Sequence, residues 1–281
     1  MNPQIRSIAR IIEPQTVMEG AGVKLRRSIA TRELNYLDPF LLLDHFDSTN
    51  PRDYVAGFPM HPHRGIETVT YVLSGSVQHR DSLNNSGSIG AGDVQWMTAG
   101  GGILHEEMPQ QSDRMNGFQL WVNLPAKLKM TNPKYQDIRS AQIAETEQAD
   151  GSRIRIITGQ VGDLSGPVTG IAAEPLYMDV VVPPSSKFTF PVERDHNSFS
   201  YVFEGKGKFG VEQAEISATA LIVWGDGDEI QVITDKSAVR FLLVAGKPLN
   251  EPVARYGPFV MNTKEEIDQA LQDLRRGTFV R

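Results

Sequence analysis

The chain of 281 residues contains no cysteine, which excludes disulfide bonds, thiolate metal ligands and cysteine nucleophiles. It also lacks any run of about 18 apolar residues, so the sequence predicts no membrane-spanning helix. No apolar stretch of signal-peptide length follows Met1. These absences together predict a cytoplasmic protein that does not associate with membranes.

Basic residues are outnumbered by acidic ones: the chain has 28 Lys and Arg residues and 34 Asp and Glu residues, and its net charge is −6. Proteins that bind nucleic acid usually present a basic face, so this acidic balance argues against direct nucleic-acid binding. Hydrophobic residues make up 40% of the chain and charged residues 22%. That composition is typical of a globular protein, and the length suits two domains of ordinary size or one large domain.

Helical periodicity is scarce, whereas short runs rich in Val, Ile, Phe, Tyr and Thr recur between turn residues. Examples lie at residues 67–73, 117–123, 176–182 and 239–244. Many short strands separated by Gly, Pro, Asn and Asp predict an all-β fold of sandwiches or barrels.

One helix is expected near the C-terminal end. Thr263 and Glu266 form the pattern of a capping box, and Gly277 supplies a stop. Between them runs an apolar stripe of Ile267, Ala270, Leu271 and Leu274.

A weak internal repeat indicates two copies of one β-barrel. Residues 67–75 and 197–205 both contain Tyr-Val in a strand that runs into a turn glycine. A polar, proline-containing stretch at 125–133 looks like the junction. The sequence therefore predicts an N-terminal barrel over residues 1–130 and a C-terminal barrel over 131–281, with the helix in the second.

The chemistry concentrates in the first copy. His61 and His63 stand two residues apart, as do His105 and Glu107, and residues at this spacing share one face of an extended strand. A lone His-x-His pair is common by chance, but only six histidines exist in the chain. Two strands that each offer two inward side chains predict a site of three imidazoles and one carboxylate. Such a set suits Fe, Mn, Ni, Cu or Zn as a divalent ion.

The motifs around these residues resemble the pirin family of the cupin superfamily. The resemblance rests on residues 61–71 (HPHRGIETVTY), 92–100 (GDVQWMTAG), 102–108 (GILHEEM) and 257–263 (GPFVMNT). It implies a bicupin, with two jelly-roll-like cupin barrels in tandem. It also implies one metal ion in the N-terminal barrel only, usually iron, with Zn, Cu, Mn, Ni or Co as alternatives. The implied ligands are His61, His63, His105 and Glu107.

The fourth ligand has an alternative, because the general cupin motif His-x-His-x-x-x-Glu uses a glutamate that corresponds to Glu67. By alternation we expect Glu67 to face inward with His61 and His63, as a ligand or as a group that orients a histidine. The pirin pattern favours Glu107. The C-terminal barrel has Pro191 and Glu193 where the first has its two histidines, so it is predicted to be metal-free.

Other residues near the motifs allow two interpretations. Phe58, Met60, Trp96, Met97 and Met108 can line an apolar pocket above the metal, or they can be barrel core.

Two histidines and a glycine run also lie outside the ligand set. His79 is expected at the barrel surface or rim, and His45 at the rim or packed. Residues 100–102 are predicted to form a tight loop at the barrel mouth, because the sequence around them lacks the features of a phosphate-binding loop.

Two functions follow from the resemblance. The first is a dioxygenase that opens the ring of flavonols such as quercetin, with dioxygen as co-substrate and release of carbon monoxide and a depside. There Glu107, once detached from the metal, would take the proton of the 3-hydroxyl group, with Glu67 or Glu106 as the less favoured alternatives. The second is a metal-dependent regulatory protein, a transcriptional cofactor or modulator of a metabolic enzyme, which would act through a protein partner without turnover.

Overall fold

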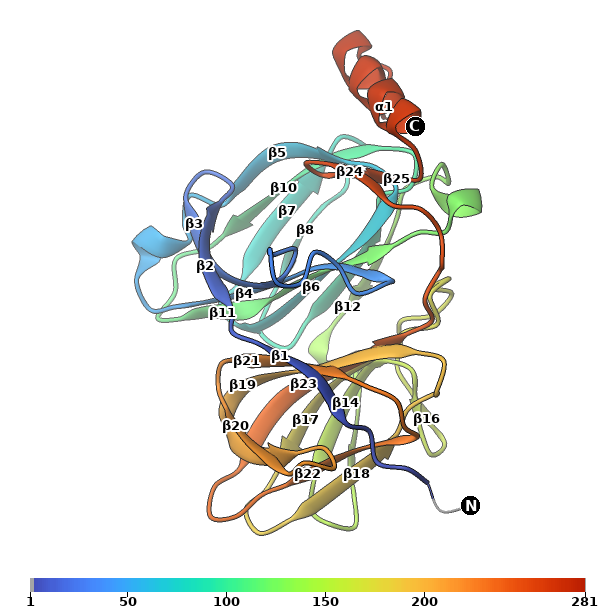
Figure 1. Ribbon diagram of the computed structural model, residues 1–281. Coiled ribbons are helices and arrows are strands. Elements are labelled where there is room, and N and C mark those ends of the chain that lie inside the picture. The colour runs from blue at the N-terminus through green and yellow to red at the C-terminus, as the bar shows by residue number, and fades with distance from the viewer. Residues whose placement is uncertain (1–2, 281) are drawn as a thin grey trace. The chain divides into compact units, whose positions relative to one another are not determined.

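The computed structural model describes residues 3–280, which form strands throughout and one C-terminal α-helix (Figure 1). The all-β architecture with a single terminal helix agrees with the prediction from sequence. The chain divides into two compact units. The first barrel comprises residues 15–140 and 249–280, and the second comprises residues 3–14 and 141–248.

The two units do not follow the expected division at residue 130, because each barrel includes a segment from the opposite end of the chain. Strand β1 (Ile8–Ile12) pairs with β21 (Ala220–Trp224) in the second barrel. The C-terminal segment, including helix α1 (Lys264–Arg276), belongs instead to the first barrel. Both segments pack against residues that are far away in the chain. Local composition and periodicity carry no information about such long-range contacts, so they could not predict these domain boundaries.

The first barrel contains a seven-stranded sheet, in the order β12-β9-β6-β11-β4-β3-β2, and a four-stranded sheet, in the order β5-β10-β7-β8. A small hairpin, β24-β25, follows near the C-terminal end. The strands are β2 (Gln15–Glu19), β3 (Val23–Ile29), β4 (Phe40–Ser48), β5 (Phe58–His63), β6 (Ile66–Ser74), β7 (Val77–Asp81), β8 (Ser86–Ile89), β9 (Val94–Thr98), β10 (Ile103–Pro109), β11 (Met115–Asn123), β12 (Lys134–Ile138), β24 (Ala254–Tyr256) and β25 (Phe259–Met261).

The second barrel is built around the long strand β19, whose first half pairs with β21 and β23 and whose second half pairs with β20 and β22. Its interior is filled by apolar side chains, among them Phe188, Phe209, Trp224 and Phe241. Its remaining strands are β13 (Ala144–Glu147), β14 (Arg153–Thr158), β15 (Gln160–Val161), β16 (Leu164–Ser165), β17 (Leu176–Val182), β18 (Lys187–Pro191), β19 (Asn197–Phe209), β20 (Ala214–Ser217), β22 (Glu229–Ile233) and β23 (Val239–Gly246).

Helix α1 begins and ends as the sequence predicts. The side chain of Thr263 accepts a hydrogen bond from the backbone N–H of Glu266, whose own side chain returns to the cap, and Gly277 adopts a left-handed conformation. Ile267 and Ala270 are buried against Phe259, Met261 and Phe279. The apolar stripe therefore packs on the hairpin of the first barrel. Over residues 3–280, no helix has both the length and the apolar character needed to cross a membrane.

Candidate metal centre

Two adjacent strands of the four-stranded sheet carry the predicted ligands. His61 and His63 lie on β5, and His105 and Glu107 lie on β10. The antiparallel register sets His105 opposite His61 and Ile103 opposite His63. Residues at this spacing share a face, so all three imidazoles project to the same side of the sheet.

The three imidazoles converge on one point. Their ligand nitrogens all lie within 4.8 Å of one another. The ring centroid of His61 lies 4.4 Å from that of His105 and 4.8 Å from that of His63. Nε2 of His61 and Nε2 of His63 are 3.0 Å apart. This triad could hold one metal ion.

Both ring nitrogens of His105, which is 1% exposed, have no hydrogen-bond partner among the described residues. Buried polar atoms are normally paired, because an unpaired one loses its hydration without compensation. Coordination of a cation would satisfy the lone pairs that face the centre of the triad.

Hydrogen bonding and burial keep the imidazoles ready to bind. Nδ1 of His61 lies 2.9 Å from the Pro59 carbonyl, which can only accept, so Nδ1 carries the hydrogen and Nε2 keeps its lone pair. Burial lowers the pKa of His63 well below its usual value, and the charge of His61 adds to the effect. Burial likewise lowers the pKa of His105. The neutral form that these shifts favour is the form that binds metal.

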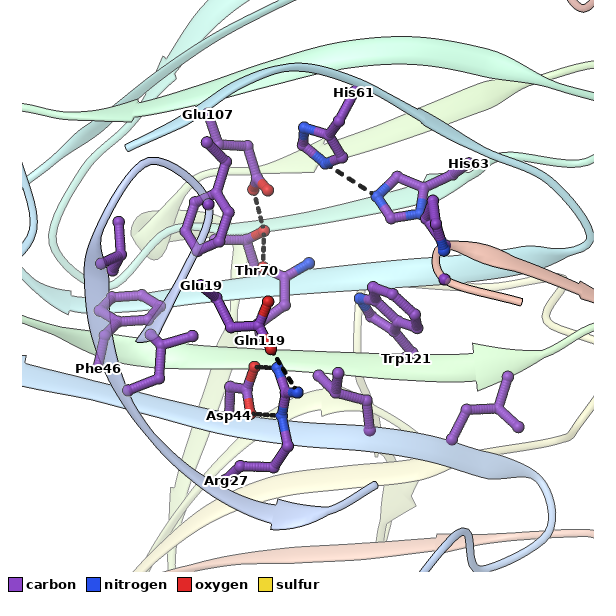
Figure 2. Close-up of a pocket in the computed structure, with 18 of the residues that line it drawn as sticks. Glu19, Arg27, Asp44, Phe46, His61, His63, Thr70, Glu107, Gln119 and Trp121 are labelled. Atoms are coloured by element: carbon purple, nitrogen blue, oxygen red, sulfur yellow. Dashed lines mark hydrogen bonds and ion pairs between the residues drawn. The ribbon is translucent and has the colours of Figure 1, made fainter. Parts of the chain in front are cut away.

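Glu107 lies beside the triad but its carboxylate is not one of the clustered ligand atoms. The side chain is 8% exposed, and its Oε1 accepts a hydrogen bond of 2.9 Å from the hydroxyl of Thr70 (Figure 2). That hydroxyl also lies 2.9 Å from Oε1 of Gln119. In this arrangement the carboxylate is directed across the cavity toward β6 and β11.

The structure places Glu67 elsewhere, which corrects the expectation that it faces inward with the histidines. Thr70 lines the cavity, and Glu67, three positions earlier on β6, lies on the opposite face of that strand. Its Oε1 accepts a hydrogen bond from Thr98, its partner in register on β9. The positive φ of Gly65, between β5 and β6, breaks the alternation on which the expectation rested.

A cavity of about 930 Å³ opens beside the triad inside the first barrel. Trp121 forms part of its wall and meets His63 edge to face, with 5.1 Å between ring centroids. On the other side, Arg27 makes a two-pronged ion pair with Asp44, at 2.8 and 2.7 Å, and reaches Glu19 at 2.7 Å (Figure 2). The cavity thus combines an aromatic wall at Trp121, a polar floor at Arg27, Asp44 and Glu19, and the imidazoles of His61 and His63.

Of the five apolar residues that could have lined this cavity, only Phe58 does so. Met97 belongs to a core cluster, Trp96 is buried and does not line the cavity, and Met60 is 42% exposed. The core interpretation therefore holds for Met97.

Two further histidines now have defined places. His79 is buried on β7 and its Nε2 lies 3.0 Å from the amide nitrogen of Gln95, so the expectation of a surface or rim residue was wrong. Its position opposite Glu107 on the neighbouring strand explains the burial. His45 packs, stacked on Phe118 with 4.6 Å between ring centroids.

Sequence reasoning missed the polar floor of the cavity. Arg27 shares a strand face with Val23 and Leu25, and Asp44 directly follows the apolar run 40–43. A charged residue on an otherwise apolar strand face is a usable signal of a buried site. No such local signal existed for Arg255 and Pro258, which reach the cavity from the C-terminal segment.

The two barrels and the histidine triad, two of whose side chains are buried, define the class as a bicupin with a candidate metal centre in one barrel. Residues 22–122 match the family description "Pirin", and residues 177–280 match "Pirin C-terminal cupin domain". The chain belongs to the pirin family.

Individual relatives agree with this assignment. A pirin-like protein of Caulobacter vibrioides is 43% identical over 277 residues, which cover 98% of this chain and 99% of the relative. The crystal structure of quercetin 2,3-dioxygenase from Acinetobacter baumannii is 35% identical, covers 98% of both chains and superposes with a TM-score of 0.89. A bacterial pirin from Escherichia coli in complex with nickel(II) shares the fold, at 18% identity and a TM-score of 0.67 over 85% of this chain and 98% of that one.

Proposed function

We propose that this protein is a metal-dependent dioxygenase that opens the ring of flavonols such as quercetin, using a metal ion held by His61, His63, His105 and Glu107. The observation that carries the proposal is the cluster of three imidazoles, two of them buried, beside a large cavity that His61 and His63 line. The 35% identity to quercetin 2,3-dioxygenase from Acinetobacter baumannii, over nearly the whole chain, supports the substrate class. We propose iron as the metal.

Glu107 completes the proposed ligand set after a side-chain rotation. Its carboxylate bonds to Thr70 in this structure, and both residues are buried, so the exchange takes place out of bulk water. The bound metal would supply a Lewis acid and a template that holds the substrate oxyanion. Since a carboxylate on this strand is the acid–base group next to the triad, Glu107 is also the residue proposed to accept the proton of the 3-hydroxyl group.

The cavity suits a flat, hydroxylated ligand. Its volume falls within the range of about 300–1,000 Å³ typical of small-molecule sites. Trp121 offers an aromatic surface beside His63, while Asp44, Gln119 and Glu19 supply hydrogen-bonding groups at the far side. Ring hydroxyls of a flavonol would replace water at these groups, and the aromatic wall would cover the ring faces.

The decisive experiment loads purified protein with iron, measures metal per chain, and follows oxygen uptake with quercetin. We expect uptake that requires both metal and flavonol, with carbon monoxide released in proportion. A fully loaded site without uptake would contradict the dioxygenase and favour a regulatory protein. Failure of the purified protein to bind any divalent metal would contradict the metal centre itself.

A further inference from the structure

The C-terminal segment meets the metal centre at the residue that follows His63. Arg64 is 1% exposed, and its Nη1 forms an ion pair of 2.8 Å with Asp273 on α1. Its Nη2 donates to the carbonyl of Phe279 at 3.1 Å, and the guanidinium lies 4.4 Å from the centroid of the Phe279 ring. One buried side chain therefore fastens the end of β5 to the helix and to the residues after it.

A second buried cation ties the same loop to the hairpin β24-β25. Nζ of Lys129 donates to the carbonyls of Gly65 and Val260, each at 2.9 Å. The backbone N–H of Val260 donates to the carbonyl of Arg64 at 3.1 Å. The loop between β5 and β6 is thus bonded to the C-terminal segment through main chain as well as side chains.

Two glycines show how closely the surfaces fit. A Cβ atom at Gly65 would collide with the carbonyl oxygen of Val260, and one at Gly102 would collide with that of Phe279. Gly65 lies two residues after His63, and Gly102 lies three residues before His105. The C-terminal segment therefore touches the chain next to both ligand strands, with no space for even a methyl group.

We propose that residues 258–279 act as a clamp that positions His63 and His105 and so sets how firmly the metal ion is held. This inference rests on the proposed metal centre. Arg64 and Asp273 are positioning residues, because they act on the ligands through the backbone that carries them. Ligands held in place by surrounding bonds lose less conformational freedom when metal binds, and removal of outer partners commonly lowers metal affinity.

The test replaces Asp273 with Asn in the full chain, loaded with Co²⁺. Dissociation is followed by transfer of the metal to an excess of chelator, and the ligand field by visible absorption. We expect release roughly 10- to 100-fold faster than from the unmodified protein, with an altered absorption spectrum. A second variant, Phe279→Leu, removes the contact of the Arg64 guanidinium with the ring and the ring's contact with Phe259, and should speed release about two- to fivefold.

Asp179→Asn is the matched control, because Asp179 pairs with Arg240 at 2.7 Å in the second barrel, whereas the triad belongs to the first. It should disturb a buried ion pair without changing release. Equal release rates in the unmodified protein, Asp273→Asn and Phe279→Leu would overturn the clamp and leave the metal centre intact. Equal acceleration in Asp179→Asn would also overturn it, since general destabilisation would then explain the effect. If the unmodified protein takes up no Co²⁺, both the clamp and the metal centre are contradicted.

Discussion

Glu107 and Glu67 differ in the direction of the carboxylate, which decides whether the group can reach a metal ion at the triad. Glu107 projects into the cavity from β10, whereas Glu67 projects from the other face of β6 and bonds to Thr98. Burial raises the pKa of Glu67, against the opposing effect of the Thr98 hydrogen bond. The carboxyl group of Glu67 therefore bonds within the sheet and does not face the cavity.

We therefore expect Glu107→Gln to reduce oxygen uptake with quercetin by about 10²- to 10⁴-fold, the usual effect of losing an acid–base group. Glu67→Gln is the control of identical chemistry and should retain most of the uptake at equal metal content. Turnover measured at saturating metal, with metal per chain determined in each sample, separates the two. The reverse ranking of the two variants would make Glu67 the functional carboxylate.

His45 gives a prediction about pH. Burial lowers its pKa to about 4 from 6.5, although the hydrogen bond with Asn116 opposes the shift. The unfolded chain therefore binds a proton near pH 6.5 that the folded chain does not bind until about pH 4. Stability from this residue is present above pH 6.5 and is lost as pH falls toward 4.

Between pH 7 and pH 5 the loss from His45 should be about 2 kcal/mol of unfolding free energy. His45→Phe keeps a ring against Phe118 but cannot be protonated, so its stability should fall less over the same interval. Urea unfolding of both proteins at the two pH values measures the loss of unfolding free energy in each. The contributions of the other histidines are the same in both proteins and cancel in the comparison. Identical losses in the two proteins would show that His45 is protonated in the fold.

At the scale of elements, β3 and β4 are joined by the ion pair under the cavity. Asp44 side-chain exposure is 5% and that of Arg27 is 15%. Burial by itself would lower the pKa of Arg27, but its bonds with Asp44 and the charge of Glu19 raise it. The guanidinium thus stays charged at all ordinary pH values, and it depends on its carboxylate partners.

Asp44→Asn should lower the unfolding free energy by about 3–5 kcal/mol, because a buried cation loses its main partner. The contrasting variant is Glu106→Gln, which breaks a pair with the 66% exposed Arg80 and should cost no more than about 1 kcal/mol. Chemical denaturation of the metal-free proteins gives both values. A loss below 1 kcal/mol for Asp44→Asn would mean that water or Glu19 replaces the bond.

At the scale of the whole molecule, metal binding should stabilise the fold by mass action. Free metal at about 1,000 times its dissociation constant adds roughly 4 kcal/mol. For a unit the size of the first barrel this corresponds to a rise of roughly 8–16 °C in the unfolding temperature. Calorimetry with and without a chelator measures the change.

His105→Ala should abolish that rise, since it removes a proposed ligand, while His196→Ala should retain it. His196 lies in the second barrel and serves as the control for loss of a histidine. A rise that survives His105→Ala would place the stabilising metal somewhere other than the triad.

The sequence could predict those features of the site that depend on residues close together in the chain. The shared face of His61 and His63, and that of His105 and Glu107, follow from the two-residue period of a strand. The helix cap of Thr263 and Glu266 is equally local. The inward placement of Glu67 failed because the same period was extended across Gly65, where the chain turns.

The sequence by itself determined the all-β class, the shared strand face of each predicted ligand pair and the terminal helix, because these depend on residues within a few positions of one another. Only the tertiary structure decided that the C-terminal segment belongs to the first barrel, that Arg27 and Asp44 form the cavity floor, and that Arg64 is bonded to Asp273. Those features join residues 17 to 209 positions apart. Their partners are selected by packing and by the need to pair buried charges, and neither is visible in a local pattern.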